Sequence, residues 1–382
     1  MNILFIHPVN IDYPGGAERF VVEVSQRLRL RGYSVGVLQV NWAPHKPVTM
    51  QNSLELLRLG IELHKCGYLK LPRGFPVFNP SCILQISRQY DLLYMSAYSP
   101  NELVIYSLKK IGILNKPVIA VFHTMLEPHR DILHRLYLPL FIAAYKVFEK
   151  LHVLNKYTYD FFVKYHGIDE RKVIFIPNGV DISRYYIKHR HSYFQILWTG
   201  RLTFDKGADT LCKVVDTFNR RYPHLINNVR FVITGSGTKV LEEYIKRLSQ
   251  RYDNVEYLGY VDQVTLRELY ATSHLYLITS RSEGMPLRVL EAMASGLPIA
   301  GSDIPGIHDL IINRHIGKSV RMGDIYGFCK AIEGFYNQWK NEPERYYGIR
   351  QTIRALTIAN FSWEVIVNKI EKMFREILLE SD

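Results

Sequence analysis

The residues of this sequence best suited to chemistry lie between Thr279 and Pro298, where a polar segment leads into a helical pattern. Pro286 suits the first position of a helix because its missing N–H has no partner there anyway, and Gly296 and Pro298 end the pattern. Free N–H groups at a helix start favour an anion, typically phosphate. We expect an anion site on the N–H groups of Gly284, Met285, Leu287 and Arg288, with Pro286 at the first helical position beside them.

Two carboxylates bracket the expected anion site. Glu283 precedes the helix and is suited to accept hydrogen bonds from sugar hydroxyls, whereas Glu291 lies more than one turn into it and is suited to hold a ribose diol. The alternative is that Glu283 only complements the helix dipole and that Glu291 is a surface charge. Their spacing alone does not separate these two interpretations.

Two cations follow a strand pattern in the same half of the chain. Arg201 and Lys206 stand five residues apart, directly after the apolar run Gln195–Thr199. A guanidinium forks onto phosphate oxygens and an ammonium adds a point charge, which together suit a diphosphate without a metal. The alternative leaves both side chains exposed and unpaired. Because these cations and the segment from Thr279 to Pro298 fall in one half of the chain, together they favour a diphosphate site.

The elements that must position these residues alternate between β-rich runs and helical patterns, which indicates parallel α/β folding. In such folds ligands bind beyond the carboxyl ends of the strands. The expected strands are Asn2–His7, Ser34–Val40, Leu92–Met95, Val118–Phe122, Lys150–Leu154, Gln195–Thr199, Val229–Thr234, Val255–Tyr257, Leu275–Thr279 and Pro298–Gly301.

The strand pattern falls into two similar halves, with an aperiodic stretch near 184–193 between them. We predict an N-terminal Rossmann-like domain over residues 1–188 and a C-terminal one over 189–360. A closing helix over 361–382, with an apolar stripe, covers its own domain or crosses back to the first.

The composition is that of a folded protein. Among 382 residues, 47% are hydrophobic and 22% charged, which excludes a disordered chain. The longest apolar run, residues 136–145, is far shorter than the roughly 20 residues that cross a bilayer. The N-terminus has no basic leader and is expected to be a first strand. The four cysteines are too scattered for a disulfide framework or a zinc ribbon, so we expect a reducing, cytoplasmic location.

The positive charge is unevenly distributed. Residues 1–190 hold 24 Lys and Arg against 14 Asp and Glu, a net +10, whereas residues 191–382 hold 24 against 22, a net +2. An excess of this kind suggests nucleic acid, a phosphorylated ligand or an anionic lipid surface as partner, unless it is only a solvated face. The basic residues are dispersed and no nucleic-acid-binding module is visible, so we expect no nucleic acid as partner.

Several motifs, in order along the chain, resemble one family. They are Gly15-Gly16-Ala17-Glu18, His123 at a strand end, Pro177-Asn178-Gly179-Val180-Asp181, Gly200-Arg201, Lys206-Gly207, Gly235-Ser236-Gly237, Glu283 with Glu291, and Phe361-Ser362-Trp363. The sequence thereby resembles the retaining nucleotide-sugar glycosyltransferases of the GT-B fold, family 4, which carry a Glu-x(7)-Glu motif. The resemblance implies an α/β protein with two Rossmann-like domains facing each other across a cleft.

The resemblance also implies roles for individual residues. Arg201 and Lys206 would bind the donor diphosphate, Glu291 the ribose, and Glu283 the hydroxyls of the transferred sugar, which His123 would approach from the first domain. The loop at Gly15 and Gly16 would bring backbone amides to the diphosphate or reacting sugar. The loops at Gly200 and Gly235 would lie near the nucleotide.

Three residues depart from the family pattern: Met285, Arg288, which places a charge in the first helical turn, and Asp309 where glutamate is common. They leave the donor identity open. The chain contains no Asp-x-Asp sequence, so we expect neither a metal nor another cofactor.

The predicted function is transfer of a hexosyl unit from a nucleoside diphosphate sugar to an acceptor hydroxyl, with retention, in glycan, polysaccharide or glycolipid biosynthesis. The alternative is a protein of the same fold that binds the nucleotide sugar without catalysis. Mixed apolar and basic residues over 129–150 suggest that the first domain contacts an anionic membrane at the inner face, or else that this is an ordinary buried helix. The expected contacts include Lys109, Lys110, Arg130 and Arg135.

Overall fold

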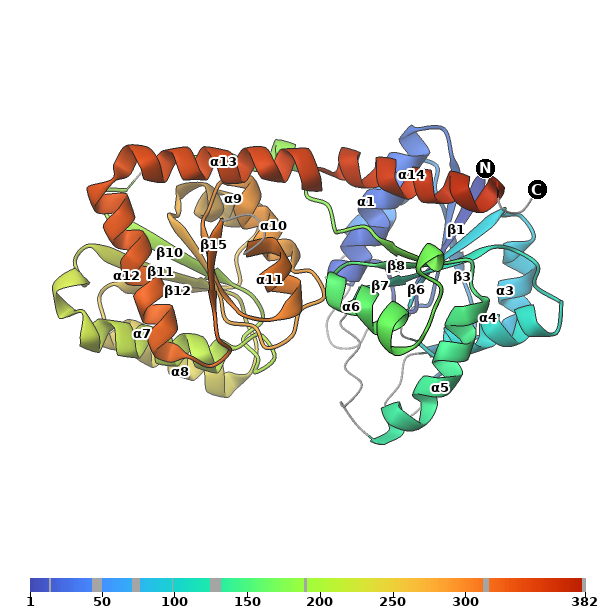
Figure 1. The fold of residues 1–382 in the computed structure, drawn as a ribbon, viewed down its shortest axis with the longest axis horizontal. Helices are drawn as coiled ribbons and strands as arrows, with labels where there is room; N and C mark the ends of the chain where they lie inside the picture. The colour runs from blue at the N-terminus through green and yellow to red at the C-terminus, as the bar shows by residue number, and fades with distance from the viewer. Residues whose placement is uncertain are drawn as a thin grey trace. The chain divides into compact units, whose positions relative to one another are not determined.

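The structure, a computed structural model, describes residues 1–13, 15–42, 50–70, 76–97, 99–123, 132–188, 191–311 and 316–379. The chain divides into two compact units, Met1–Asn178 with Ile366–Asp382 (unit 1) and Gly179–Val365 (unit 2). These divisions lie at 178–179 and 365–366, whereas the sequence predicts domain boundaries at 188–189 and 360–361. Each unit is a parallel sheet flanked by helices, so the predicted α/β class is confirmed (Figure 1).

Unit 1 is built on a seven-stranded parallel sheet in the order β3-β2-β1-β6-β7-β8-β9. On the interior strand β1, Leu4 lies opposite Gly36 of β2 and Leu93 of β6. Two further strands, β4 and β5, form a separate antiparallel pair. The strands are β1 (Asn2–Ile6), β2 (Ser34–Gln39), β3 (Glu62–Lys65), β4 (Tyr68–Lys70), β5 (Pro76–Phe78), β6 (Leu92–Ser96), β7 (Val118–Phe122), β8 (Lys150–Val153) and β9 (Val173–Phe175).

Alternate residues along these strands supply two buried layers, because successive side chains point to opposite faces of a sheet. Leu4 and Leu93 join the core that includes residues of α3, α4 and α5. Tyr94 instead contacts Phe20 of α1 and Phe374 of α14, at ring distances of 6.2 and 5.7 Å. The helices are α1 (Gly16–Leu30), α2 (Gln51–Arg58), α3 (Pro80–Ser87), α4 (Asn101–Lys110), α5 (Ile132–Val147), α6 (Lys156–Asp160) and α14 (Trp363–Leu379), of which α14 begins in unit 2.

Unit 2 is built on a six-stranded parallel sheet in the order β12-β11-β10-β13-β14-β15. Leu197 of β10 lies opposite Val232 of β11 and Tyr276 of β13. The strands are β10 (Phe194–Thr199), β11 (Val229–Thr234), β12 (Val255–Gly259), β13 (Leu275–Ile278), β14 (Ile299–Ser302) and β15 (Gly317–Val320). The helices are α7 (Ala208–Arg221), α8 (Lys239–Arg251), α9 (Gln263–Thr272), α10 (Leu287–Ala294), α11 (Pro305–Ile311), α12 (Ile325–Asn341) and α13 (Pro343–Phe361).

All ten predicted strands are confirmed, and no end differs by more than two residues. The sequence missed β3, β9 and β15, together with the β4–β5 pair. Glu62–Lys65 and Gly317–Val320 are edge strands rich in polar residues, so they lack the apolar run that marks a buried strand. Val173–Phe175 is apolar, but it is only three residues long.

One cysteine pair is disulfide-bonded, which the sequence analysis, expecting scattered cysteines in a reducing location, did not predict. Cys66 and Cys82 are disulfide-bonded in unit 1, with Cα atoms 6.1 Å apart, so the bond joins the segment before β4 to α3. Cys212 and Cys329 are free and buried. Sequence spacing does not show the pairing because the two cysteines stand on separate elements.

The Pro177–Asp181 motif passes from unit 1 into unit 2, where its last residues pair with the end of α13. The N–H of Val180 donates to the carbonyl of Phe361 at 2.8 Å, and the N–H of Trp363 donates to the carbonyl of Val180 at 3.3 Å. A Cβ at position 179 would lie 2.3 Å from the Trp363 ring, which explains the glycine there.

Within the described residues, no helix combines the length and apolar character that a membrane span requires.

Candidate functional site

In unit 2 the predicted site residues gather at one edge of the sheet. Gly200 directly follows β10, Gly235 directly follows β11, and the segment that leads to Glu283 follows β13. These three strands are parallel neighbours in the sheet, so the segments that follow them leave at the same edge. The structure thus brings together the two sequence segments that were predicted to form the site, the one after Gln195–Thr199 and the one from Thr279 to Pro298.

Close backbone packing accounts for the glycines in these loops. A Cβ at Gly235, whose φ is +127°, would lie 1.8 Å from the carbonyl oxygen of Gly200. Leu202 and Gly237 form a backbone bridge, and a Cβ at Gly237 would lie 2.1 Å from the Leu202 carbonyl oxygen. The loops therefore touch through bare backbone, which only glycine permits at such distances.

Lys206 and Glu283 form an ion pair between the two loops. The Lys206 Nζ lies 2.8 Å from Glu283 Oε1, and Ser280 Oγ donates to the same oxygen at 2.8 Å. The side chains are 25% and 13% exposed. The predicted phosphate cation is thus neither fully exposed nor unpaired. It also compensates the charge of one carboxylate that brackets the anion site.

Arg201 differs from Lys206 in its surroundings. Its side chain is 61% exposed and its Nη2 lies 3.4 Å from Asp205 Oδ2, a long contact between solvated groups. The loop that carries it is fixed by Arg281, which the sequence analysis did not select. The Arg281 N–H donates to the carbonyl of Asp205 at 2.8 Å, and its guanidinium forms two 2.7 Å hydrogen bonds with Asp209.

The N-terminus of α10 lies where the sequence predicts an anion site, with one correction to the prediction. Pro286 is the N-cap in an extended conformation, φ −74° and ψ 115°, and Leu287 is the first helical residue. Within the part of the chain that the structure describes, the N–H groups of Leu287 and Arg288 have no acceptor. These unsatisfied donors are what a phosphate oxygen would accept from. The Met285 side chain is buried.

Glu291 is held by two donors at one of its oxygens. The Tyr270 hydroxyl donates to Glu291 Oε2 at 3.1 Å, and Arg288 Nη1 lies 2.9 Å from the same oxygen. The Glu291 side chain is 17% exposed, so it is not the surface charge of the alternative interpretation. Burial, followed by the Glu291 carboxylate, raises the pKa of Tyr270. Because Tyr270 lies on α9, no local sequence signal could have found it.

The opposite end of α10 is capped by arginines of α13. Arg350 is 1% exposed, and its Nε and Nη2 each donate at 3.2 Å to the carbonyls of Gly296 and Ser295. Arg354 Nη1 donates to the carbonyls of Ala294 and Tyr185. Burial lowers the pKa of both guanidiniums. Cations at a helix C-terminus match its dipole, so α10 is fixed at the end remote from the expected anion site.

In unit 1 the Gly15–Gly16 loop is supported by a buried polar row. Glu18 Oε1 lies 3.0 Å from His7 Nε2, and His7 Nδ1 lies 2.8 Å from Ser96 Oγ. These three side chains belong to residues that are 5% exposed or less. A Cβ at Gly15 would lie 2.0 Å from Glu18 Oε2, so the carboxylate occupies the space that any larger residue needs.

His123 also ends its strand at this edge of unit 1. Its ring lies 4.9 Å from that of Phe20, and its enclosed Nε2 has no hydrogen-bond partner among the described residues. Burial, then the neighbouring His7 and His152, lowers the pKa of His123 well below the usual range. The imidazole is therefore neutral near pH 7, with an orphan nitrogen left for a further polar group.

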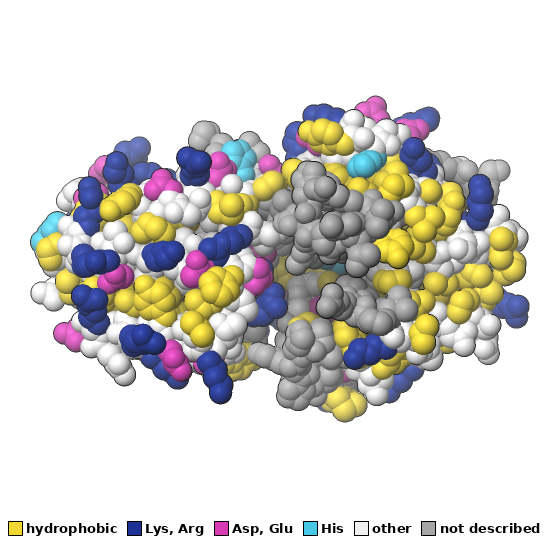
Figure 2. Space-filling view, turned by 90° about the horizontal axis from the view of Figure 1, so that it is seen from below, with side chains coloured by type: hydrophobic (Ala, Val, Ile, Leu, Met, Phe, Trp, Pro, Cys, Tyr) yellow, Lys and Arg dark blue, Asp and Glu magenta, His cyan; other side chains and the backbone are white. Residues whose placement is uncertain are grey.

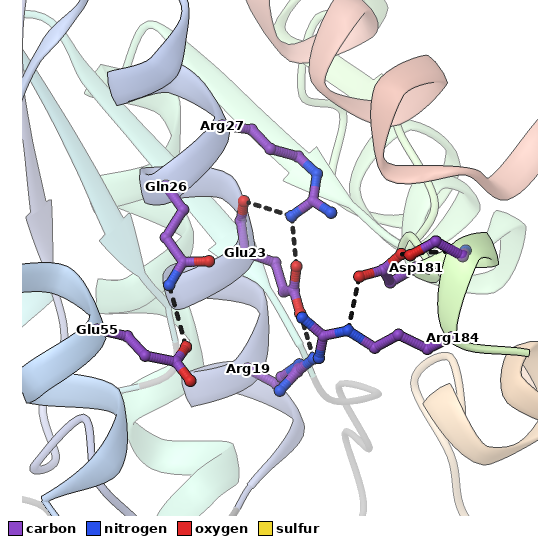
Figure 3. Close-up of polar contacts among 8 residues, drawn as sticks. Arg19, Glu23, Gln26, Arg27, Glu55, Asp181 and Arg184 are labelled. Atoms are coloured by element: carbon purple, nitrogen blue, oxygen red, sulfur yellow. Dashed lines mark hydrogen bonds and ion pairs between the residues drawn. The ribbon is translucent and has the colours of Figure 1, made fainter. Parts of the chain in front are cut away.

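A charged cluster lies along α1, beyond the glycine loop. Figure 3 shows Glu23 between Arg19 and Arg27 on consecutive turns of α1, while Gln26 Nε2 donates to Glu55 of α2 at 3.2 Å. Glu23 is 2% exposed and accepts from both guanidiniums. The Gln26–Glu55 bond ties α1 to α2, and the ion pairs of Glu23 stabilise α1 itself, the helix that starts at the glycine loop.

The two halves of the chain match glycosyltransferase families. Residues 14–184 match the family described as "Glycosyltransferase Family 4", and residues 193–338 match "Glycosyl transferases group 1". The chain belongs to the glycosyltransferases. The matched regions hold the glycine loop and His123 in the first case, and Lys206, Glu283 and Glu291 in the second.

Relatives of this glycosyltransferase include lipid-modifying enzymes. One subunit of the human phosphatidylinositol N-acetylglucosaminyltransferase is 25% identical over 213 residues, 54% of this chain and 41% of that protein. The first relatives found are matched over less than half of their own length. A phosphatidyl-myo-inositol mannosyltransferase of Mycolicibacterium smegmatis is 21% identical, but over 99% of this chain and 94% of that protein.

Solved structures confirm the GT-B fold class. Anabaena HepE in complex with UDP superposes with a TM-score of 0.77 at 18% identity, covering 98% of this chain and 100% of that one. A glycosyltransferase from Rickettsia africae ESF-5 gives 0.78 at 18% identity, over 99% and 98% of the two chains.

No cluster of three or more His, Cys, Asp or Glu side chains suited to a metal ion occurs among the described residues.

Proposed function

We propose that this glycosyltransferase transfers a hexosyl unit from a nucleoside diphosphate sugar to an acceptor hydroxyl, with retention at the anomeric carbon. One observation carries the donor assignment: the unsatisfied first turn of α10 lies between two carboxylates, Glu283 and Glu291, each paired with a cation. Backbone N–H groups and Lys206 then stabilise the charge that develops on the departing diphosphate. The carboxylates accept hydrogen bonds from sugar and ribose hydroxyls.

The donor test is a thermal-shift panel of nucleotide sugars, beginning with UDP-glucose. Complexes of HepE with UDP and with UDP-glucose make a uridine donor the first choice. A ligand at about 100 times its Kd stabilises the folded protein by about 2.7 kcal/mol, a readily measured rise in melting temperature. If no nucleotide sugar raised the melting temperature, the donor site would be wrongly assigned.

A protein of the same fold that binds the donor without transferring the sugar is the second candidate. Product analysis separates the two, because only the enzyme consumes the donor when acceptors are supplied. Retention is read from the anomeric configuration of the product by NMR. We propose that transfer needs no metal, so dialysis against a chelator should leave the rate unchanged. If the dialysis abolished transfer and added Mg²⁺ or Mn²⁺ restored it, metal-independent transfer would be refuted.

For the acceptor we propose a glycan or a lipid-linked sugar alcohol, reached by peripheral contact with an anionic membrane on its cytoplasmic side. The names of two relatives, which act on phosphatidylinositols, support a lipid acceptor. Exposed apolar side chains occur after α4 and on α5, with Ile111, Ile113 and Tyr137 being 65%, 58% and 54% exposed. Figure 2 shows apolar side chains gathered on one face of unit 1.

The cations expected at this surface need revision. Lys109 is only 10% exposed and its Nζ lies 3.0 Å from Glu149 Oε1, so it is committed within the fold. Lys110 is exposed, whereas Arg130 and the side chain of Arg135 lie outside the described residues. Co-sedimentation with phosphatidylglycerol vesicles, reversed by salt and weakened by Ile113→Ser, would support the contact. Equal recovery with phosphatidylcholine vesicles would exclude it.

A further inference from the structure

The two oxygens of the Glu291 carboxylate have different surroundings. Oε2 accepts from the Tyr270 hydroxyl at 3.1 Å and pairs with Arg288 Nη1 at 2.9 Å. Among the described residues nothing donates to Oε1, although the side chain keeps 17% of its surface exposed. One oxygen is thus fully used by the protein, and the other still has its acceptor capacity.

The two donors to Glu291 Oε2 belong to different helices. Tyr270 is completely buried on α9, its ring 5.8 Å from that of Tyr276 and 6.0 Å from that of Tyr185. Its hydroxyl therefore has a fixed position. Arg288 lies three residues before Glu291 on α10, so their side chains are neighbours on the helix surface. Together they restrict rotation of the carboxylate.

The Arg288 charge matters because of the neighbouring anion site. An unpaired carboxylate beside a diphosphate would repel it, and in a partly buried site that repulsion is stronger than in water. Glu283 solves the same problem with Lys206. Arg288, which departs from the family pattern, supplies the counter-charge for Glu291 from within the helix itself.

We propose that Arg288 and Tyr270 are positioning residues that occupy Glu291 Oε2 and thereby present Oε1 to the ribose hydroxyls of the donor. This rests on the proposed function, because it assumes that a nucleoside diphosphate binds at α10. It goes further by naming what orients the ribose contact, and it predicts that the two residues govern recognition of the ribose rather than of the diphosphate.

The experiment compares binding of UDP with that of 2′,3′-dideoxy-UDP, which keeps the base and diphosphate but lacks the ribose hydroxyls. Each charge-assisted hydrogen bond contributes enough to change affinity by about 10- to 100-fold, so calorimetry on the intact chain should show at least such a preference for UDP. Arg288→Met should reduce this preference by about tenfold, and Tyr270→Phe by a smaller factor. Arg220→Gln, which removes an exposed guanidinium paired with Asp216 on α7, should leave it unchanged.

A double-mutant cycle with Glu291→Gln distinguishes positioning from a general structural effect. If Arg288 acts through Glu291, Arg288→Met should not reduce the preference further in the Glu291→Gln protein. Should Arg288→Met fail to fold, Tyr270→Phe removes a single oxygen and supplies the same comparison.

The outcomes separate this inference from the proposed function. Positioning is supported if the single variants lose part of their preference for UDP over dideoxy-UDP, and if the same changes cause no further loss in the Glu291→Gln protein. If Arg288→Met weakens UDP and dideoxy-UDP by the same factor, Arg288 contacts the diphosphate or only stabilises the fold, and the inference is wrong. If neither compound binds the unaltered protein, and ADP and GDP also fail, the proposed donor site itself is wrong.

Discussion

Glu102 makes the stability of unit 1 depend on pH in a direction unusual for a carboxylate. This residue of α4 is fully buried, and its Oε2 accepts a 2.7 Å hydrogen bond from the buried Tyr145 hydroxyl. Burial outweighs that bond and raises the pKa of Glu102 from 4.5 to about 8. In the folded chain the carboxyl is therefore protonated at neutral pH, whereas in the unfolded chain it is ionised.

The sign and size of the effect follow by linkage. Between pH 4.5 and about 8 the unfolded chain has released a proton that the folded chain retains, so raising the pH favours unfolding. The contribution is fully present below the unfolded pKa and is lost as pH rises toward the folded one. At about 1.36 kcal/mol per pH unit, unit 1 should lose about 2 to 3 kcal/mol between about pH 5.5 and about pH 7.5 through this group.

Glu102→Gln removes the titration while keeping the shape and an acceptor for Tyr145. Amide hydrogen exchange of the β6 peptide, read by mass spectrometry, reports the opening of unit 1 alone. Between about pH 5.5 and about pH 7.5, the opening free energy of the unaltered chain should fall by about 2 to 3 kcal/mol relative to that of Glu102→Gln. Glu344→Gln, at an exposed position of α13, is the matched control. A difference that stays constant across the pH range would refute the reasoning.

Three further changes test the site and its support. Lys206→Met should weaken UDP binding by about 10- to 100-fold in calorimetry, because it removes a phosphate cation and leaves Glu283 uncompensated; an unchanged Kd would remove Lys206 from the donor site. Arg350→Met should lower the unfolding free energy by about 1 to 3 kcal/mol in denaturant titrations, since two buried carbonyls lose their donor; unchanged stability would show that water replaces it. His123→Ala should lower kcat by about 100-fold with a UDP Kd within about twofold; a kcat close to that of the unaltered enzyme would exclude a role in turnover.

Much of the scaffold follows from the sequence, because parallel strands buried on both faces must be apolar runs. Gln195–Thr199 and Val229–Thr234 are recognisable for this reason, and their order places Gly200 and Gly235 at strand ends. The glutamates and cations were likewise selected by local pattern. Edge strands such as Glu62–Lys65 were not predicted because they are partly exposed to solvent, where polar residues are tolerated.

What the sequence does not reveal is which groups meet. Lys206 and Glu283 are 77 positions apart, and Tyr270 reaches Glu291 from another helix. The pairing of Cys66 with Cys82 and the capping of α10 by Arg350 are contacts of the same kind.

Local pattern was sufficient for the periodic features: the strands, the glycines at their ends, and the acidic and basic residues that a diphosphate site needs. The folded chain was required to show which oxygen of Glu291 is occupied, that Lys206 is paired while Arg201 is exposed, and that Pro286 caps rather than starts α10. This division arises because periodicity records burial, a property of each residue, whereas charge compensation and hydrogen bonding depend on distances between residues far apart in the chain.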